Sequence, residues 1–149
     1  MGCYALGGVI RREIKPGTSA KITSVIDVYF SWIRTIIGQF SHIITQRSLV
    51  EKVYHDELGF IEGRLQFTDD SRLEFGELKN GRVVSKPKYR YQYMNRKNEL
   101  IFRYDNAKHY PDLPNFPHHK HSPGGVEAST EPTLENVLEE IQNLILDEE

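Results

Sequence analysis

Residues 88–105, KYRYQYMNRKNELIFRYD, decide the fold that the rest of the chain completes. In the first third of this stretch three tyrosines alternate with polar residues, which is the period of a strand with one buried face. The last third alternates again, and places Phe102 and Tyr104 on one side and Arg103 and Asp105 on the other. The polar residues between the two parts are typical of a turn, so the stretch predicts an antiparallel hairpin.

The same period extends upstream of this hairpin. Between residues 49 and 87 apolar and polar residues alternate, and turn-forming residues recur at short intervals. This pattern is typical of an antiparallel meander. We therefore expect an α+β fold, with an antiparallel sheet of about five strands packed by an N-terminal and a C-terminal helix.

Two segments have the spacing of amphipathic helices. The first begins at Thr23 or Ser24, either of which can cap it, and ends near Gly38. Its expected apolar stripe consists of Val25, Val28, Tyr29, Trp32, Ile33 and Ile36. The second follows Thr133 as its cap. Its expected stripe consists of Leu134, Val137, Leu138, Ile141, Leu144 and Ile145.

The chain of 149 residues is long enough for one domain with a single core. Residues 1–20 show neither period and contain glycines and a proline, so we expect a loosely ordered arm there and a single domain over residues 21–149. A lone cysteine, Cys3, cannot form an internal disulfide, and no apolar run is long enough to span a membrane. We expect a soluble cytoplasmic protein without a membrane partner.

The net charge of −2 conceals an uneven distribution. Residues 131–149 contain seven acids and no base, whereas residues 79–120 contain ten bases and three acids. Such a basic field attracts phosphate, and nucleic acid is a common partner with many phosphates. The open alternatives are a solvated charged face without a ligand and a surface that docks an acidic protein.

Residues 100–121, LIFRYDNAKHYPDLPNFPHHKH, carry the candidate chemistry, because they contain four of the six histidines. Prolines and glycines predict a loop over residues 106–125. Two imidazoles can serve as base and acid near neutral pH, and cationic side chains can stabilise a phosphate in its transition state. The candidate catalytic residues are Arg103, Asp105, His118, His119 and His121. The candidate substrate-binding residues are Arg90, Tyr104, Asn106, His109 and Lys120.

These residues predict RNA cleavage without a metal or other cofactor. A second interpretation is a metal-dependent hydrolase, since imidazoles and a carboxylate are ordinary ligands of zinc, nickel or manganese. A third is a non-catalytic binding module that inhibits an acidic partner. Each histidine can also have a purely structural role.

Three segments carry a resemblance to a known family. LIFRYDNA at 100–107, FPHHKH at 116–121 and EPTLENVLEEI at 131–141 resemble the TumE family of type II toxin–antitoxin proteins. The similarity extends over roughly residues 24–145. It implies a small growth-inhibiting toxin that a cognate antitoxin binds and silences, whereas the ribonuclease role comes from the residue types alone. Tyr110 stands where the family tends to have a histidine.

Overall fold

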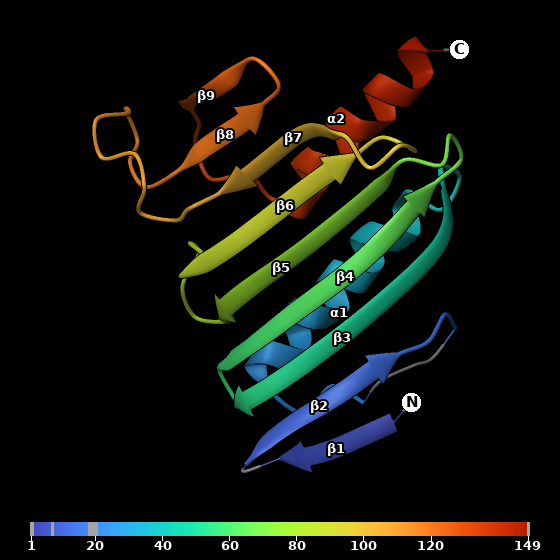
Figure 1. Ribbon diagram of the computed structural model, residues 1–149. Helices are drawn as coiled ribbons and strands as arrows, with labels where there is room; N and C mark the ends of the chain where they lie inside the picture. The colour runs from blue at the N-terminus through green and yellow to red at the C-terminus, as the bar shows by residue number, and fades with distance from the viewer. Residues whose placement is uncertain (1, 7, 18–20, 149) are drawn as a thin grey trace.

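A computed structural model describes residues 2–6, 8–17 and 21–148 of the chain. A nine-stranded antiparallel sheet, with its strands in chain order, is covered on one face by two helices (Figure 1). The strands are β1 (Gly2–Leu6), β2 (Val9–Ile14), β3 (Ile44–His55), β4 (Leu58–Phe67), β5 (Arg72–Asn80), β6 (Lys88–Met94), β7 (Leu100–Asp105), β8 (His119–Ser122) and β9 (Gly125–Ala128). The helices are α1 (Val25–Gln39) and α2 (Leu134–Asp147). The α+β class and the antiparallel meander are thus confirmed.

The expected number of about five strands is wrong, because both ends of the sheet extend further than predicted. Residues 9–14, which we expected to be loosely ordered, form β2 and pair with β3. Residues 119–122, which we expected to be loop, form β8 and pair with β7. Both strands are short and lie among glycines or prolines, so their pairing depends on a neighbouring strand that local sequence does not reveal.

Both helices begin at the predicted caps. The Ser24 side chain accepts a hydrogen bond from the backbone N–H of Asp27, and Thr133 forms a reciprocal capping box with Asn136. Caps of this kind stabilise a helix by about 1 kcal/mol each. Neither helix in the described ranges is long and apolar enough to cross a membrane.

The predicted buried face of α1 is wrong in part. Val28 and Trp32 are 58% and 41% exposed, although both belong to the expected stripe. The residues of α1 that the structure buries are Ile26, Asp27, Phe30, Ile33, Ile36 and Ile37. Because α1 is apolar on most of its circumference, spacing alone does not fix the face that meets the sheet.

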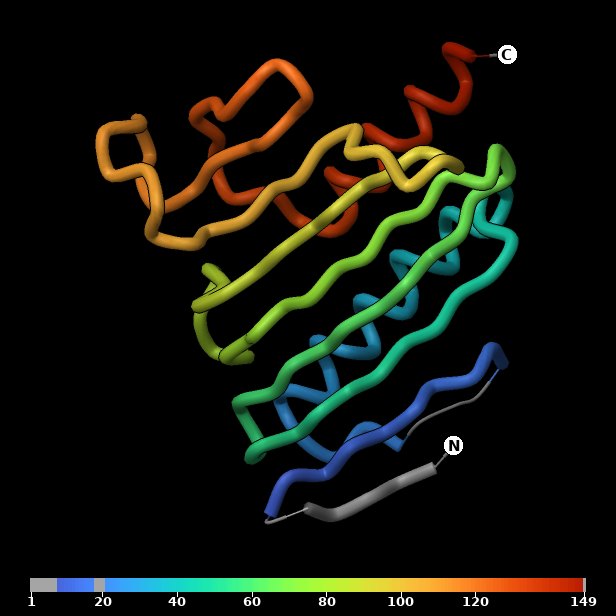
Figure 2. The backbone as a smooth tube through the Cα atoms, viewed as in Figure 1, coloured from blue at the N-terminus to red at the C-terminus, as the bar shows by residue number. Residues whose placement is uncertain are grey.

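Close contact between α1 and the sheet is possible because β4 has a glycine at the crossing point. A Cβ atom on Gly59 would lie 2.7 Å from the Phe30 ring and 2.8 Å from the carbonyl oxygen of Lys52. A larger residue would therefore push the helix away from the strand. Figure 2 shows β3, β4 and β5 running side by side in front of α1.

The core lies between the helices and the sheet. Tyr89, Tyr91 and Tyr93 of β6 are all buried in it, and Tyr93 packs against Phe102 of β7 at 5.2 Å between ring centroids. The predicted tyrosine stripe is thus cross-strand packing. The opposite face of β6, β7 and β8 carries no helix, and the candidate site lies there.

Candidate functional site

Four of the predicted residues meet where β7 pairs with β8. Arg103 lies opposite His121, and Asp105 lies opposite His119. Because side chains alternate along a strand, all four project from the helix-free face of the sheet. We call Arg103, Asp105, His119 and His121 the β7–β8 cluster.

Contacts within the cluster are short. The Asp105 carboxylate places Oδ1 2.9 Å from Nε2 of His119 and Oδ2 3.6 Å from Nε2 of His121. Arg103 donates from Nε to Oδ2 of Asp105 at 3.0 Å, and its Nη2 lies 3.0 Å from Nε2 of His121. The Arg103 side chain is 31% exposed, so a cation lies at the opening of the cluster.

His119 lies at the bottom of the cluster and is 2% exposed. Its Nδ1 lies 2.9 Å from the carbonyl oxygen of Pro117. A carbonyl only accepts, so Nδ1 carries the hydrogen and donates it. Nε2 is buried and, within the described part of the chain, has no hydrogen bond of proper geometry despite its closeness to Asp105.

His121 is more accessible than His119. Burial and the neighbouring Arg103 guanidinium lower the pKa of His121 below its usual value. The imidazole is therefore neutral near pH 7, and its Nε2 accepts the hydrogen bond from Arg103.

Tyr110, which our sequence analysis did not select as a site residue, covers both imidazoles. Its ring packs edge-on against His119 and His121, at centroid distances of 5.0 and 5.7 Å. The rings of His109 and Tyr110 meet edge to face, with 6.4 Å between their centroids. In the sequence Tyr110 lies between His109 and the histidines at 118–121, and this position is the signal that could have identified it as a site residue.

Two other predicted residues face the helices. The Lys120 ammonium contacts Oε1 of Glu140 on α2 at 2.7 Å, and the Tyr104 hydroxyl donates to Oε2 of the same carboxylate at 2.7 Å. Burial opposes the charge on Lys120, but the bonds to Glu140 and Tyr104 outweigh it and raise the pKa of Lys120. The structure therefore places Tyr104 and Lys120 on the face opposite the β7–β8 cluster.

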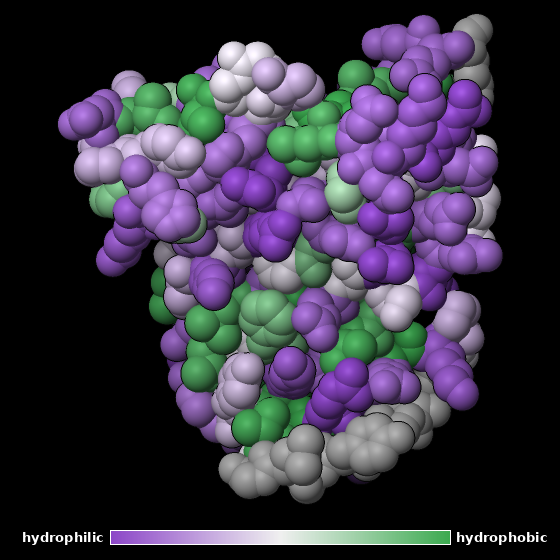
Figure 3. Space-filling view, in the orientation of Figure 1, coloured by the Kyte–Doolittle hydropathy of each residue, from purple (hydrophilic) through white to green (hydrophobic). Residues whose placement is uncertain are grey.

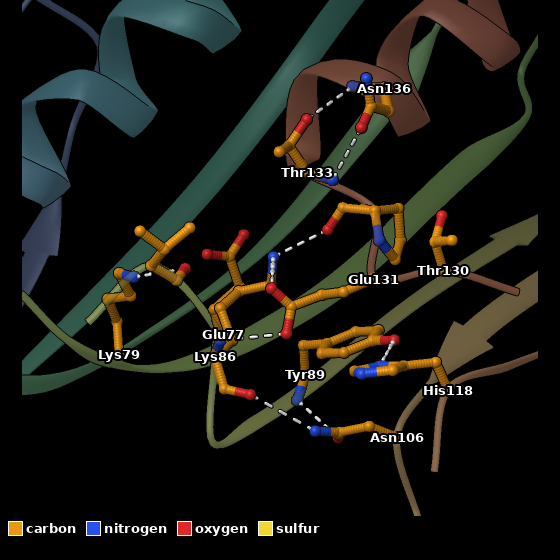
Figure 4. A network of polar contacts seen from close by, with 12 residues as sticks. Glu77, Lys79, Lys86, Tyr89, Asn106, His118, Thr130, Glu131, Thr133 and Asn136 are labelled. Carbon is orange, nitrogen blue, oxygen red and sulfur yellow. Dashed lines mark hydrogen bonds and ion pairs between the residues drawn. The ribbon is translucent and has the colours of Figure 1, made fainter. Parts of the chain in front are cut away.

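His118 and Asn106 also lie away from the cluster, in a structural network (Figure 4). The His118 ring stacks on Tyr89 and places Nδ1 2.8 Å from its hydroxyl. The Asn106 side chain accepts from the backbone N–H of Tyr89 and donates to the carbonyl oxygen of Pro87. These contacts hold the start and the end of the loop between β7 and β8.

Arg90 lies on the same face as the cluster, because its Cα atom pairs with that of Asp105. Its guanidinium donates to the Gln92 side chain on the same strand. Next to Arg90 lies a shallow hollow of about 240 Å³, lined in part by Phe60, Lys88 and Glu74. In Figure 3, which views this face, hydrophilic side chains gather over the upper half.

The cluster combines a cation, a carboxylate and two imidazoles on an accessible face. Arg103 can bind a phosphate oxygen, and the other three can hold or move protons or bind a cation. The three ligating atoms of Asp105, His119 and His121 lie within 4.8 Å of one another. All four cluster residues lie within the segments 100–107 and 116–121, which carry the resemblance to the TumE family.

Comparison with known proteins supports this resemblance. The family model described as Toxin TumE matches residues 33–145, which is most of the chain and includes the whole cluster. Searches of curated proteins and of solved structures found no match. The match begins within α1, so β1 and β2 lie outside it. The chain therefore belongs to the TumE toxin family.

Proposed function

We propose that this protein is a cytoplasmic toxin that inhibits growth by cleaving RNA at the β7–β8 cluster. Toxin family membership implies an antitoxin partner. The observation that carries the RNA proposal is the position of Arg103, whose half-buried side chain contacts both Asp105 and His121. A phosphate bound by Arg103 would lie directly beside the groups that can move protons.

In the proposed reaction the 2′-hydroxyl of a ribose loses its proton to a base in the cluster, and its oxygen bonds to phosphorus. The bond from phosphorus to the 5′ oxygen breaks, and that oxygen takes a proton from water. The products are a 2′,3′-cyclic phosphate and a 5′-hydroxyl. Arg103 stabilises the negative charge on the phosphate during this exchange.

The base–acid pair that the sequence suggested is only partly supported by the geometry. His118 lies with Tyr89 on the helix side, and His119 is enclosed at the bottom of the cluster. Of the two imidazoles in the cluster, His121 is the more accessible, because its side chain is 14% exposed and that of His119 2%. Cleavage thus needs a proton acceptor or an activated water in place of a second free histidine.

The helix-free face offers a path for the rest of the RNA. Lys88 and Arg90 line the hollow of about 240 Å³, which supplies two cations near the cluster. The Phe60 ring lies at its other side and can pack against a base. Glu74 also lines the hollow, so Lys88 and Arg90 share it with a carboxylate and do not form a continuous basic patch.

The test is to incubate purified protein with cellular RNA and to map any cut ends. We expect His121→Ala and Arg103→Ala to lower the cleavage rate at least about 100-fold, as for other residues that act on the transition state. His118→Ala and Lys120→Ala are matched controls, because both residues lie in the same segment but face the helices. Both controls are expected to retain most of the rate.

Two outcomes would contradict the proposal. Equal loss in His118→Ala and His121→Ala, with all variants folded, would move the chemistry away from the cluster. Growth inhibition without RNA cleavage by any variant would favour the non-catalytic binding module.

A further inference from the structure

We propose that Asp105, His119 and His121 bind one divalent transition-metal ion on the helix-free face. Metal binding is argued from the geometry alone, whereas a role of the ion in cleavage rests on the proposed function. The three donor atoms come from two neighbouring strands, β7 and β8.

The donor atoms lie close enough together to converge on one ion. Bonds of about 2.1 Å place neighbouring ligand atoms about 3.0 Å apart in octahedral and about 3.4 Å apart in tetrahedral geometry. The Asp105 carboxylate places Oδ1 2.9 Å from Nε2 of His119 and Oδ2 3.6 Å from Nε2 of His121, and one ligand atom from each of the three residues lies within 4.8 Å of the others. The two contacts with the carboxylate are close to these values, and side-chain rotation would close the wider separations around an ion.

The buried imidazole of His119 points its free nitrogen into the site. Nδ1 donates to the Pro117 carbonyl, and Nε2 lies 2.9 Å from Oδ1 of Asp105. Within the described residues this buried Nε2 has no hydrogen bond of proper geometry. A bound cation would satisfy both groups, and the bond from Nδ1 to a backbone carbonyl is the arrangement that orients metal-binding histidines.

Asp105 is supported in the same way. Its Oδ1 accepts from the backbone N–H of Ala107 at 3.0 Å, and its Oδ2 accepts from Arg103. Bonds of this kind fix a ligating carboxylate. Two imidazoles and one carboxylate select a transition metal such as Zn²⁺ or Mn²⁺ over Mg²⁺, which prefers oxygen ligands and retains its waters.

Arg103 is the group that opposes cation binding, because its Nη2 contacts the Nε2 of His121. The Arg103 side chain is 31% exposed and can turn outward toward a phosphate without entering the core. In that arrangement the ion would take the place of Arg103 on His121. Water bound to the ion would then lose a proton, and the resulting hydroxide would accept the 2′-hydroxyl proton of the RNA.

Isothermal titration calorimetry of the chelator-treated full chain with Zn²⁺, Mn²⁺ and Mg²⁺ tests the site. We expect one equivalent of Zn²⁺ to bind, with Mn²⁺ weaker and Mg²⁺ weakest. His121→Ala is expected to weaken Zn²⁺ binding at least about tenfold, and His118→Ala to leave it unchanged. Asp105→Asn is the second ligand variant, with circular dichroism to confirm that each protein is folded.

The possible outcomes distinguish failure of the metal site from failure of the proposed RNA cleavage. Absence of Zn²⁺ binding, or equal binding by the wild type and by folded His121→Ala, overturns the metal site. If chelator-treated protein still cleaves RNA in EDTA, the proposed ribonuclease activity stands and the proposed role of the metal ion in cleavage is wrong. If Zn²⁺ binds with the expected losses but no RNA is cleaved, the metal site stands and the proposed function fails.

Discussion

Asp105 is the residue that holds the β7–β8 cluster together. Its two carboxylate oxygens contact His119, His121, Arg103 and the backbone N–H of Ala107. The side chain is largely buried, so replacing it would leave the imidazoles and the guanidinium without their common partner. The alternation of β8 then decides which neighbours join it, because only every second side chain reaches this face.

Tyr110 is a second single residue on which the cluster depends, because its ring covers both imidazoles. We expect Tyr110→Ala to lower RNA cleavage about tenfold, because the imidazoles lose the packing that fixes their orientation. Tyr110→Phe keeps the ring and is expected to retain the rate. The melting temperature should change little in either variant, because the side chain is 36% exposed.

NMR of the histidine ring protons provides a second measurement for Tyr110. Removing the aromatic ring should shift the His119 and His121 signals in Tyr110→Ala but not in Tyr110→Phe. If Tyr110→Phe loses as much activity as Tyr110→Ala, the hydroxyl rather than the ring is the functional group.

At the scale of the element, β6 links the core to the site. Its tyrosines face the helices, and Lys88, Arg90 and Gln92 face the other way. The Tyr93 hydroxyl donates to Oγ of Ser71 at 2.7 Å, and the Tyr91 hydroxyl donates to Glu77 at 2.7 Å. One strand therefore contributes both a buried polar network and part of the helix-free face.

The buried tyrosines predict how stability depends on alkaline pH. Burial raises the pKa of Tyr93 to about 12, and the pKa of Tyr89 and Tyr91 is raised in the same direction for the same reason. In the unfolded chain these groups ionise near pH 10, so the stability that depends on the protonated tyrosines is complete below about pH 10. It is then lost as the pH rises through about 12.

Urea unfolding at pH 8, 10 and 11, with absorbance of the ionised tyrosine at each pH, measures this loss. Tyr93→Phe should lose about 1 kcal/mol at pH 8 with the Ser71 hydrogen bond, but its free energy of unfolding should fall less between pH 10 and 11. Complete tyrosine ionisation near pH 10 in a protein that stays folded would contradict the assignment.

On the scale of the whole molecule, β2 joins α1 to the sheet through charge. Arg12 contacts Asp27 of α1 and lies 3.4 Å from Glu51 of β3, and Arg34 of α1 also contacts Glu51. Burial opposes the charge of Asp27, but its bonds to Arg12 and Thr23 outweigh this and lower its pKa. For Glu51 burial prevails over the two arginines, and its pKa is raised.

Removing Arg12 should destabilise the folded chain by about 3–5 kcal/mol, because Asp27 would remain buried without its charged partner. The matched control is Arg11→Ala, since Arg11 is the neighbouring residue of β2 on the opposite face and pairs with Glu13 near the surface. That variant is expected to change the free energy of unfolding by less than about 0.5 kcal/mol.

Urea unfolding of both arginine variants at pH 7 decides the point. Similar small losses in Arg12→Ala and Arg11→Ala would mean that β2 is dispensable to the domain, as our expectation of a loosely ordered arm over residues 1–20 implied.

The sequence by itself determined the elements whose signals are local. The possible caps at Thr23 or Ser24 and at Thr133 located the starts of the helices to within one residue, and the period of two predicted the buried face of β6 and the opposite sides of Tyr104 and Asp105. The family also followed from sequence, because the resemblance rests on short segments of unusual composition. Hydrogen bonds within a turn and alternation along a strand need no distant partner, which is why these predictions were confirmed.

Only the tertiary structure decided which residues meet. That His119 and His121 join Asp105, while His118 and Lys120 face the helices, depends on β8 pairing with β7. The burial of Asp27 on α1 likewise depends on Arg12, which is 15 residues away in the chain. Strand pairing and the burial of a charge depend on the free energy of contacts between segments that are distant in the sequence. The local spacing of residues therefore does not predict them.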